Sequence, residues 1–246
     1  MPRVARLAIV AIFTLAILSA ASAQEKRVAL LIGNADYKHA AKLNTPVNDV
    51  HDFAALLKSA GFSIYTFTDL DGFQMRSAFI EFAARAKSSD LAVVFYAGHA
   101  MEFDADNRLL PVDAKVDSQP SARASGIALG DILKSLNEAG GPALVIVNAG
   151  RQNPFSRSGV VSPVSSDSFP NQIVAFSTGP GSKSIDGDAR NSPFVAALLK
   201  RLVSPGVPIE QLLRPVREDV MEITKGRQIP WTHTSMIRDV ILVPAR

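Results

Sequence analysis

The chain has 246 residues, 47% of them hydrophobic and none of them cysteine, with a formal net charge of +3. This composition allows a sizeable α/β core, and the missing cysteines exclude disulfides, thiolate metal sites and a cysteine nucleophile. The chain has no Lys/Arg tract and no aromatics interleaved with basic residues, so its charge does not favour nucleic-acid binding.

Residues 1–23 have the layout of a secretory signal peptide. Arg3 and Arg6 precede the apolar run LAIVAIFTLAILSA, and Ala21-Ser22-Ala23 places small residues at the −3 and −1 positions before Gln24. The run is short for an uncleaved membrane anchor. Removing Arg3 and Arg6 lowers the basic count from 26 to 24 against 23 acidic residues, so the mature chain has a net charge of +1. We therefore expect an exported protein that has no membrane association once its signal is cleaved.

The first half of the mature chain alternates strand-like and helix-like stretches. Residues 27–33 and 91–100 are apolar runs that end in glycine-containing turns, as expected of strands buried on both faces. Residues 62–69 alternate in polarity and predict a strand, whereas 45–61 and 72–90 have the spacing of amphipathic helices. The stretch 102–115 is expected to be a turn within a hairpin or an irregular excursion, because Pro111 limits strand pairing.

The second half continues this alternation. Residues 128–140 predict a helix, 143–148 a buried strand, and 173–179 a further strand. The segment 153–172 is rich in Ser, Pro and Gly and predicts a surface loop. Helices are expected over 192–205 and 208–226, and 234–244 is expected to close the sheet. The order of elements predicts an α/β fold in which helices cover both faces of a parallel sheet, with one domain over residues 24–246.

Candidate chemistry begins with His99, which follows a predicted buried strand between Gly98 and Ala100. An imidazole there could serve as a general base or pack as an ordinary strand-end histidine. His51 and Asp49 are expected on a solvated helix face. The four histidines lack metal-ligand spacing, so no metal and no cofactor is predicted. The chain also lacks a P-loop and a G-x-S-x-G elbow.

Seven stretches occur in an order that is similar to a known family: RVALLIGNADY, LNTPVNDVHDFAALLKSAGF, DLAVVFYAGHA, NRLLPVDA, NAGRQNPF, AFSTGPGSKSIDGDARNSPFVAALL and GRQIPW. Together they resemble bacterial caspase-like domains, the metacaspase and orthocaspase branch of the C14 peptidases. The resemblance runs from about Lys26 to Val243. It implies a three-layer α/β/α sandwich on a mostly parallel six-stranded sheet, and a cysteine–histidine dyad at the carboxyl ends of adjacent strands.

The resemblance assigns roles to individual positions. His99 matches the dyad histidine, and Ala100 stands where the family has the glycine whose N–H helps to bind the oxyanion. Alanine keeps that N–H but disfavours a positive φ. Gly150 occupies the position of the cysteine nucleophile and Asn148 that of the aspartate that reads a substrate's Arg or Lys. The next acid of the motif is Gln152, whereas Arg151, Asn153, Pro154 and Phe155 match the family.

These replacements predict a pseudo-peptidase. A glycine hydrogen can neither attack a carbonyl nor carry an acyl group, and an amide does not pair with guanidinium as a carboxylate does. The leading hypothesis is an exported caspase-like protein that binds peptides, or an active caspase-like homologue, without proteolysis. Two alternatives remain: a weak hydrolase that uses His99 with a serine such as Ser177 or with water, and a structural envelope protein. We expect it in the periplasm or secreted. Self-cleavage of the loop 156–170 is not available without a nucleophile.

Overall fold

The computed structural model describes residues 25–103, 106–155 and 169–245, and the predicted signal peptide lies outside them. Its centre is a six-stranded sheet in the order β2-β1-β3-β7-β8-β9. The strands are β1 (Arg27–Gly33), β2 (Ser63–Thr68), β3 (Leu91–Ala97), β7 (Ala143–Asn148), β8 (Gln172–Phe176) and β9 (Trp231–Thr234). All neighbouring pairs are parallel except β8 with β9. This confirms the mostly parallel six-stranded sheet.

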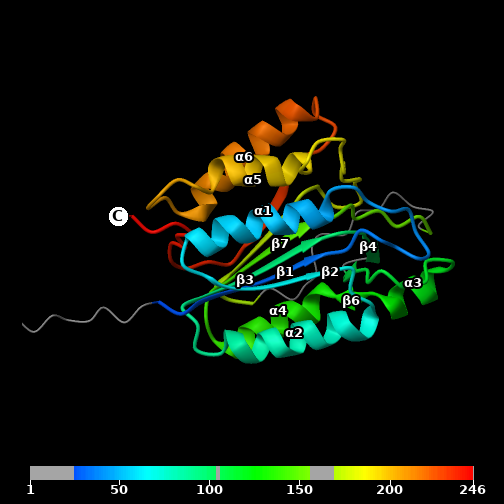
Figure 1. The fold of residues 1–246 in the computed structure, drawn as a ribbon, viewed down its shortest axis with the longest axis horizontal. Coiled ribbons are helices and arrows are strands. Elements are labelled where there is room, and N and C mark those ends of the chain that lie inside the picture. Colours follow the sequence, from blue (N-terminus) through cyan, green and yellow to red (C-terminus); the bar gives the residue numbers. More distant parts are fainter. Residues whose placement is uncertain (1–24, 104–105, 156–168, 246) are drawn as a thin grey trace, which may run out of the picture.

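Helices cover both faces of the sheet, which gives three layers (Figure 1). One face carries α1 (Pro46–Ser59), α5 (Pro193–Arg201) and α6 (Ile209–Ile223), and the other carries α2 (Gly72–Ala86) and α4 (Leu129–Ala139). The strands β1, β3, β7 and β8 are buried along their whole length. Their near-continuous apolar sequences follow from this double coverage.

Local sequence signals explain where several helices begin and end. The Asp71 side chain accepts the N–H of Gln74, whose own side chain accepts the N–H of Asp71, and this capping box starts α2. Ser192 caps α5 through the N–H of Val195. Gly140 ends α4 at a φ of 89°, a left-handed conformation that glycine adopts at little cost.

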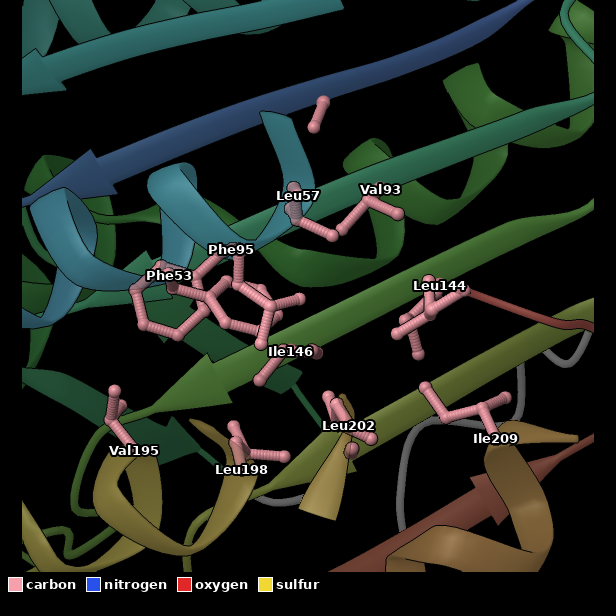
Figure 2. Packing of buried hydrophobic residues seen from close by; sticks show 14 of the residues in the cluster. Phe53, Leu57, Val93, Phe95, Leu144, Ile146, Val195, Leu198, Leu202 and Ile209 are labelled. Carbon is pink, nitrogen blue, oxygen red and sulfur yellow. The ribbon is translucent and has the colours of Figure 1, made fainter. Parts of the chain in front are cut away.

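The core between the sheet and the α1, α5 and α6 layer contains a large cluster of buried apolar residues (Figure 2). Phe53 of α1 packs against Phe95 of β3, with ring centroids 5.0 Å apart. Neither ring is exposed to solvent. Burying one such phenylalanine contributes roughly 1.5–3 kcal/mol to folding. This packing ties α1, and the loop that precedes it, to the middle of the sheet.

A second, three-stranded antiparallel sheet lies beside the ends of the central strands. It consists of β4 (Ala100–Phe103), β5 (Asp106–Leu109) and β6 (Ile127–Ala128). The hairpin alternative for residues 102–115 is therefore correct for its first part. The short helix α3 (Gln119–Ser125), which the sequence pattern did not predict, precedes β6 and starts with a side-chain cap from Ser118.

The prediction that residues 234–244 close the sheet is wrong in position. The closing strand, β9, ends at Thr234, and the hydroxyl of Ser235 then bonds with the backbone of Gln172. Beyond it, Val240 and Leu242 are buried against the α5 and α6 side of the core, with only a single bridge between Ile241 and Pro208. The apolar run is thus explained by core burial.

None of the helices in the described residues is both long and apolar enough to cross a bilayer.

Candidate functional site

The ends of two adjacent strands bring His99 and Gly150 to the same place. In the β3–β7 pair Ala97 lies opposite Asn148, and His99 and Gly150 each follow two residues later. The N–H of Gly98 donates to the carbonyl of Asn148 at 3.2 Å, which keeps the two segments together past the ladder. The carboxyl ends of parallel strands are the usual position of a binding site in such sheets.

A cavity of about 380 Å³ opens at this point. Both His99 and Gly150 line it, as do the predicted site residues Ala100 and Asn148. Most of the remaining wall is apolar, and the polar groups come from a few positions. The other lining residues are Ala40, Leu43, Thr45, Pro46, Gly98, Met101, Leu110, Val116, Ala149, Gln152, Pro154, Lys183, Ser184, Ile185, Asp186 and Ser192. An apolar cavity of this size with a few converging polar groups is typical of a ligand site.

His99 is held in one orientation by the loop that follows β1. Its Nε2 lies 2.7 Å from the carbonyl oxygen of Ala41, and its ring packs on that of Tyr37 at a centroid distance of 4.5 Å. A carbonyl only accepts, so Nε2 carries the proton and Nδ1 is left as the acceptor of the ring. The histidine is therefore set up to accept a hydrogen bond or a proton through Nδ1.

Two buried tyrosines support the turn on which His99 sits. The Tyr37 hydroxyl accepts the N–H of His99 at 2.8 Å, and the Tyr96 hydroxyl donates to the His99 carbonyl at 2.7 Å. Burial raises the pKa of both phenols, so they stay protonated. A Cβ at Gly98 would lie 2.6 Å from both hydroxyls, so only glycine fits between them.

Gly150 is covered by the loop after β8. A Cβ built on Gly150 would lie 3.1 Å from the backbone nitrogen of Ser184 and 3.6 Å from Cα of Lys183. The N–H of Arg151 donates to the carbonyl of Ser182 at 2.9 Å, which holds this loop in place. A larger residue at position 150 therefore requires the loop to move by a few tenths of an ångström.

Asn148 lines the cavity but is largely buried, and its amide nitrogen is engaged by two neighbouring side chains. Its Nδ2 donates to Oδ2 of Asp49 at 3.0 Å and to Oγ of Ser192 at 2.9 Å. Asp49 is completely buried, which corrects the expectation that it lies with His51 on a solvated helix face. The sequence signal was available, because Asp49 precedes Val50 and Phe53 on the buried side of α1. The site thus retains a carboxylate that motif comparison did not identify.

Asp49 joins three elements of the fold. Its Oδ1 accepts the N–H of Ser192, the residue that caps α5, while its Oδ2 accepts from Asn148 at the end of β7. Burial raises the pKa of Asp49 to about 6, against the opposing effect of its hydrogen bonds to Ser192. A strongly shifted carboxyl group beside a cavity is a common property of functional sites.

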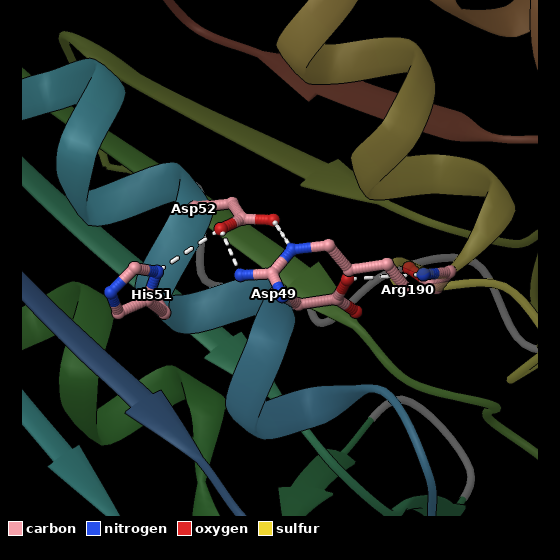
Figure 3. Close-up of polar contacts among 5 residues, drawn as sticks. Asp49, His51, Asp52 and Arg190 are labelled. Carbon is pink, nitrogen blue, oxygen red and sulfur yellow. Dashed lines mark hydrogen bonds and ion pairs between the residues drawn. The ribbon is translucent and has the colours of Figure 1, made fainter.

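Two further carboxylates of this region fasten the loop before α5 to the start of α1. Asp186 accepts the backbone N–H of Thr45 at 3.1 Å, and Asp52 binds Arg190 through two contacts of 2.7 Å (Figure 3). Arg190 holds the pKa of Asp52 well below its usual range. His51 contributes a contact of 3.1 Å to the same carboxylate and is otherwise exposed. The loop before α5 is therefore fastened to the α1 region at two points.

Arg151 lies behind the cavity and is not exposed at all. Its guanidinium carbon lies 4.0 Å from the ring centroid of Phe176, and Nη2 donates to the Thr178 carbonyl at 3.2 Å. Burial lowers the pKa of Arg151 to about 10, and the nearby Glu102 opposes that shift. Glu102 in turn accepts the N–H of Gly181. Together these contacts hold the loop over Gly150 against the strand ends.

Ala100 and Ser177 have clear structural positions. Ala100 is the first residue of β4. Its φ is not positive, so alanine causes no backbone strain there. Ser177 is fully buried, and its hydroxyl lies 3.3 Å from the Ala149 carbonyl and 3.0 Å from Oγ of Ser184. It is not among the residues that line the cavity.

Within the described ranges, no group of three or more His, Asp or Glu residues is arranged to hold a metal ion.

Comparison with known proteins identifies a family model and two curated proteins that are similar to this chain. The family model described as "Caspase domain" matches residues 26–242. The chain is 27% identical over 218 residues to human mucosa-associated lymphoid tissue lymphoma translocation protein 1, covering 82% of this chain and 25% of that protein. The mouse homolog gives the same identity and length, over 24% of its chain. The chain thus spans about a quarter of the curated relatives it matches.

The fold is also similar to a solved structure. Caspase-1 from Spodoptera frugiperda superposes with a TM-score of 0.67 at 18% identity, over 89% of this chain and 91% of that one. At this identity the likeness concerns the fold.

Proposed function

Because this chain belongs to the caspase-domain family, we propose that it is an exported, non-catalytic member that binds peptide or protein segments in the cavity beside His99. One observation carries this proposal. Gly150, which stands at the position of the family's cysteine nucleophile, lines the same cavity as His99, and the chain has no cysteine. Covalent peptidase chemistry needs a nucleophile that glycine does not provide.

The rest of the site favours binding. The cavity has a mainly apolar wall, His99 offers Nδ1 as an acceptor, and the loop over Gly150 is fixed by Arg151 and Glu102. A preformed site of this kind binds a segment without a large ordering cost. Its ligand is a peptide or an active caspase-like homologue whose exposed segment enters the same cavity.

Peptide binding is tested with fluorescence anisotropy on a fluorescent peptide library and a matched pair of variants. Ala40 lines the cavity and is partly exposed, so Ala40→Trp fills the entrance, whereas Ala84 is exposed on α2 and Ala84→Trp serves as the control. We expect selected peptides to bind the wild type and Ala84→Trp, and to lose at least about tenfold in affinity for Ala40→Trp. Equal binding by both variants would reject the cavity as the site. A structural envelope protein would give no peptide-dependent rise in melting temperature.

Catalysis is tested on the same preparations. We expect no hydrolysis of Arg-, Lys- or Asp-terminated fluorogenic peptides by the wild type. Hydrolysis that disappears in His99→Ala would instead support the weak hydrolase, in which His99 activates water or a serine. The burial and hydrogen bonding of Ser177 leave that residue poorly placed for this role.

Export is proposed from the first 23 residues alone. The basic start, the apolar run and Ala21-Ser22-Ala23 predict cleavage before Gln24 and delivery to the periplasm or the medium. Cell fractionation, followed by mass determination of the recovered chain, tests both points. A chain that keeps Met1 and stays in the cytoplasm would contradict them.

A further inference from the structure

The outer edge of β2 is an open end of the central sheet. β2 is the first strand in the sheet order, and within the described part of the chain it pairs only with β1. The N–H and C=O groups on its other side are therefore available for pairing with another strand. All six of its residues are partly or fully exposed, whereas β1, β3, β7 and β8 are buried throughout, and Phe67 is 39% exposed.

This edge lacks the usual protection against pairing. Residues 63–68 read SIYTFT, with no charge and no proline, and all but the first are β-branched or aromatic. Natural edge strands are commonly short, charged or interrupted by proline, because an unprotected edge recruits another strand. The opposite edge, β9, is only four residues long, and Glu210 and Arg217 contact Thr234 and the Pro230 carbonyl beside it.

The charges beside β2 are separated along the strand. Lys58 lines the same groove as Ser63, and the guanidinium carbon of Arg85 lies 4.6 Å from the ring centroid of Tyr65. The other end of the strand continues into Asp69, whose carboxylate accepts backbone N–H groups of the loop after β1, and into Asp71, whose carboxylate caps α2. The edge thus has a basic end and an acidic end. A strand that carries the same charges in the reverse direction complements both ends.

We propose that the partner of this edge is β2 of a second copy of the chain, paired antiparallel about a twofold axis at Thr66. In this register Tyr65 faces Phe67 of the other copy, and Thr66 faces its own equivalent. The basic end of each copy then meets the acidic end of the other. An isologous contact of this kind closes on itself and gives a dimer. Aromatic and threonine pairs across two strands stabilise such a ladder.

The groove beside the strand has room for the added side chains. It has a volume of about 840 Å³ and lies between α1 and β2. Its helical wall includes the small residues Ala54 and Ala55. Side chains on the α1 face of an added strand would enter this groove. This inference does not depend on the cavity at His99, which lies at the ends of β3 and β7.

The test is the association state of purified full-chain protein, measured by sedimentation equilibrium over a range of concentrations. Thr66→Lys places two like charges face to face, and Thr232→Lys makes the same change in the middle of β9. We expect a dimer in the wild type and in Thr232→Lys, with the dissociation constant raised about tenfold or more in Thr66→Lys. A monomeric wild type would overturn the proposal. So would a dimer that survives Thr66→Lys and is lost in Thr232→Lys.

A charge-swap mixture separates loss of pairing from loss of folding. Thr66→Glu alone is expected to be monomeric, like Thr66→Lys. An equimolar mixture of the two is expected to recover the dimer, because opposite charges then meet at the axis. Recovery supports the twofold at Thr66. Two folded variants, judged by circular dichroism, that do not associate when mixed would overturn that register.

Discussion

The amide nitrogen of Asn148 donates to Oδ2 of Asp49 at 3.0 Å, although the two residues are 99 positions apart. Both are buried, one at the end of β7 and the other in the first turn of α1. An amide is the donor that a buried carboxylate needs, whereas a second carboxylate at this distance would compete with it for protons. Asn148 is therefore matched to its surroundings in the folded protein.

Asn148→Asp is expected to lower stability by about 2 kcal/mol at pH 8, because one of two adjacent carboxyl groups must then be neutral or remain unpaired. The loss is expected to shrink toward pH 5, where one of the two is protonated. Urea unfolding at both pH values measures the change. Asn137→Asp on α4 serves as a control for the same substitution outside the site. A loss that is the same at both pH values would contradict the contact.

Asp49 predicts a second pH effect. Its pKa in the folded state, about 6, lies above the ordinary value of 3.8, so the folded state takes up a proton before the unfolded state does. Its contribution to stability therefore grows as the pH falls through 6 and is lost as the pH rises. Relative to Asp49→Asn, the wild type is expected to gain roughly 2 kcal/mol between pH 7.5 and 4.5. If the stability of the wild type and of Asp49→Asn changed equally with pH, hydrogen bonding to Asp49 would offset its burial. If the wild type lost stability relative to the variant as the pH fell, hydrogen bonding would outweigh burial.

The pair of Asp52 and Arg190 anchors the loop on an exposed surface (Figure 3). Such pairs contribute little to global stability, so Arg190→Ala is expected to change the melting temperature only slightly. The loop that precedes α5 is expected to be cut several-fold faster in limited proteolysis, because one of its anchors is gone. Arg214→Ala removes an exposed ion pair with Glu218 on α6 and is the matched control. Unchanged cleavage in Arg190→Ala would show that Asp186 and Ser192 suffice.

Gly150→Cys tests whether the site has lost only its chemistry. The Cβ needs a shift of a few tenths of an ångström at Ser184, which a loop can provide. We expect cleavage of fluorogenic peptides at least about a hundredfold above the wild type, and its loss when His99→Ala is added. Gly150→Ala adds the same Cβ without a thiol and controls for the movement of the loop. Asn148→Asp is left out of this variant because of its conflict with Asp49.

A silent Gly150→Cys that reacts with iodoacetamide would show an accessible thiol that His99 cannot activate. A silent variant that does not react would show that the Lys183–Ser184 segment closes the site. Either result would change the description of the cavity, and only the second would argue against a peptide reaching Gly150.

Local patterns predicted the sheet and most helices because each element carries its own signal. Continuous apolar runs identified β1, β3 and β7, and helical spacing identified α1 and α2. The same reasoning placed the last strand too late, since an apolar run does not show whether it is paired or packed. Val240 and Leu242 are packed. The short helix α3 was missed because it buries only Ala122 and has little periodicity.

The chemical identity of each residue could be known from the sequence: Gly150 has no nucleophile, the chain has no cysteine, and the motifs around His99 resemble one family. Tertiary structure decided which groups meet. The pairing of Asn148 with Asp49 and the loop over Gly150 depend on contacts between distant segments, and burial alone raises the pKa of Asp49. A linear pattern records residue types in order, whereas desolvation and hydrogen bonding depend on which residues the folded chain brings within a few ångströms.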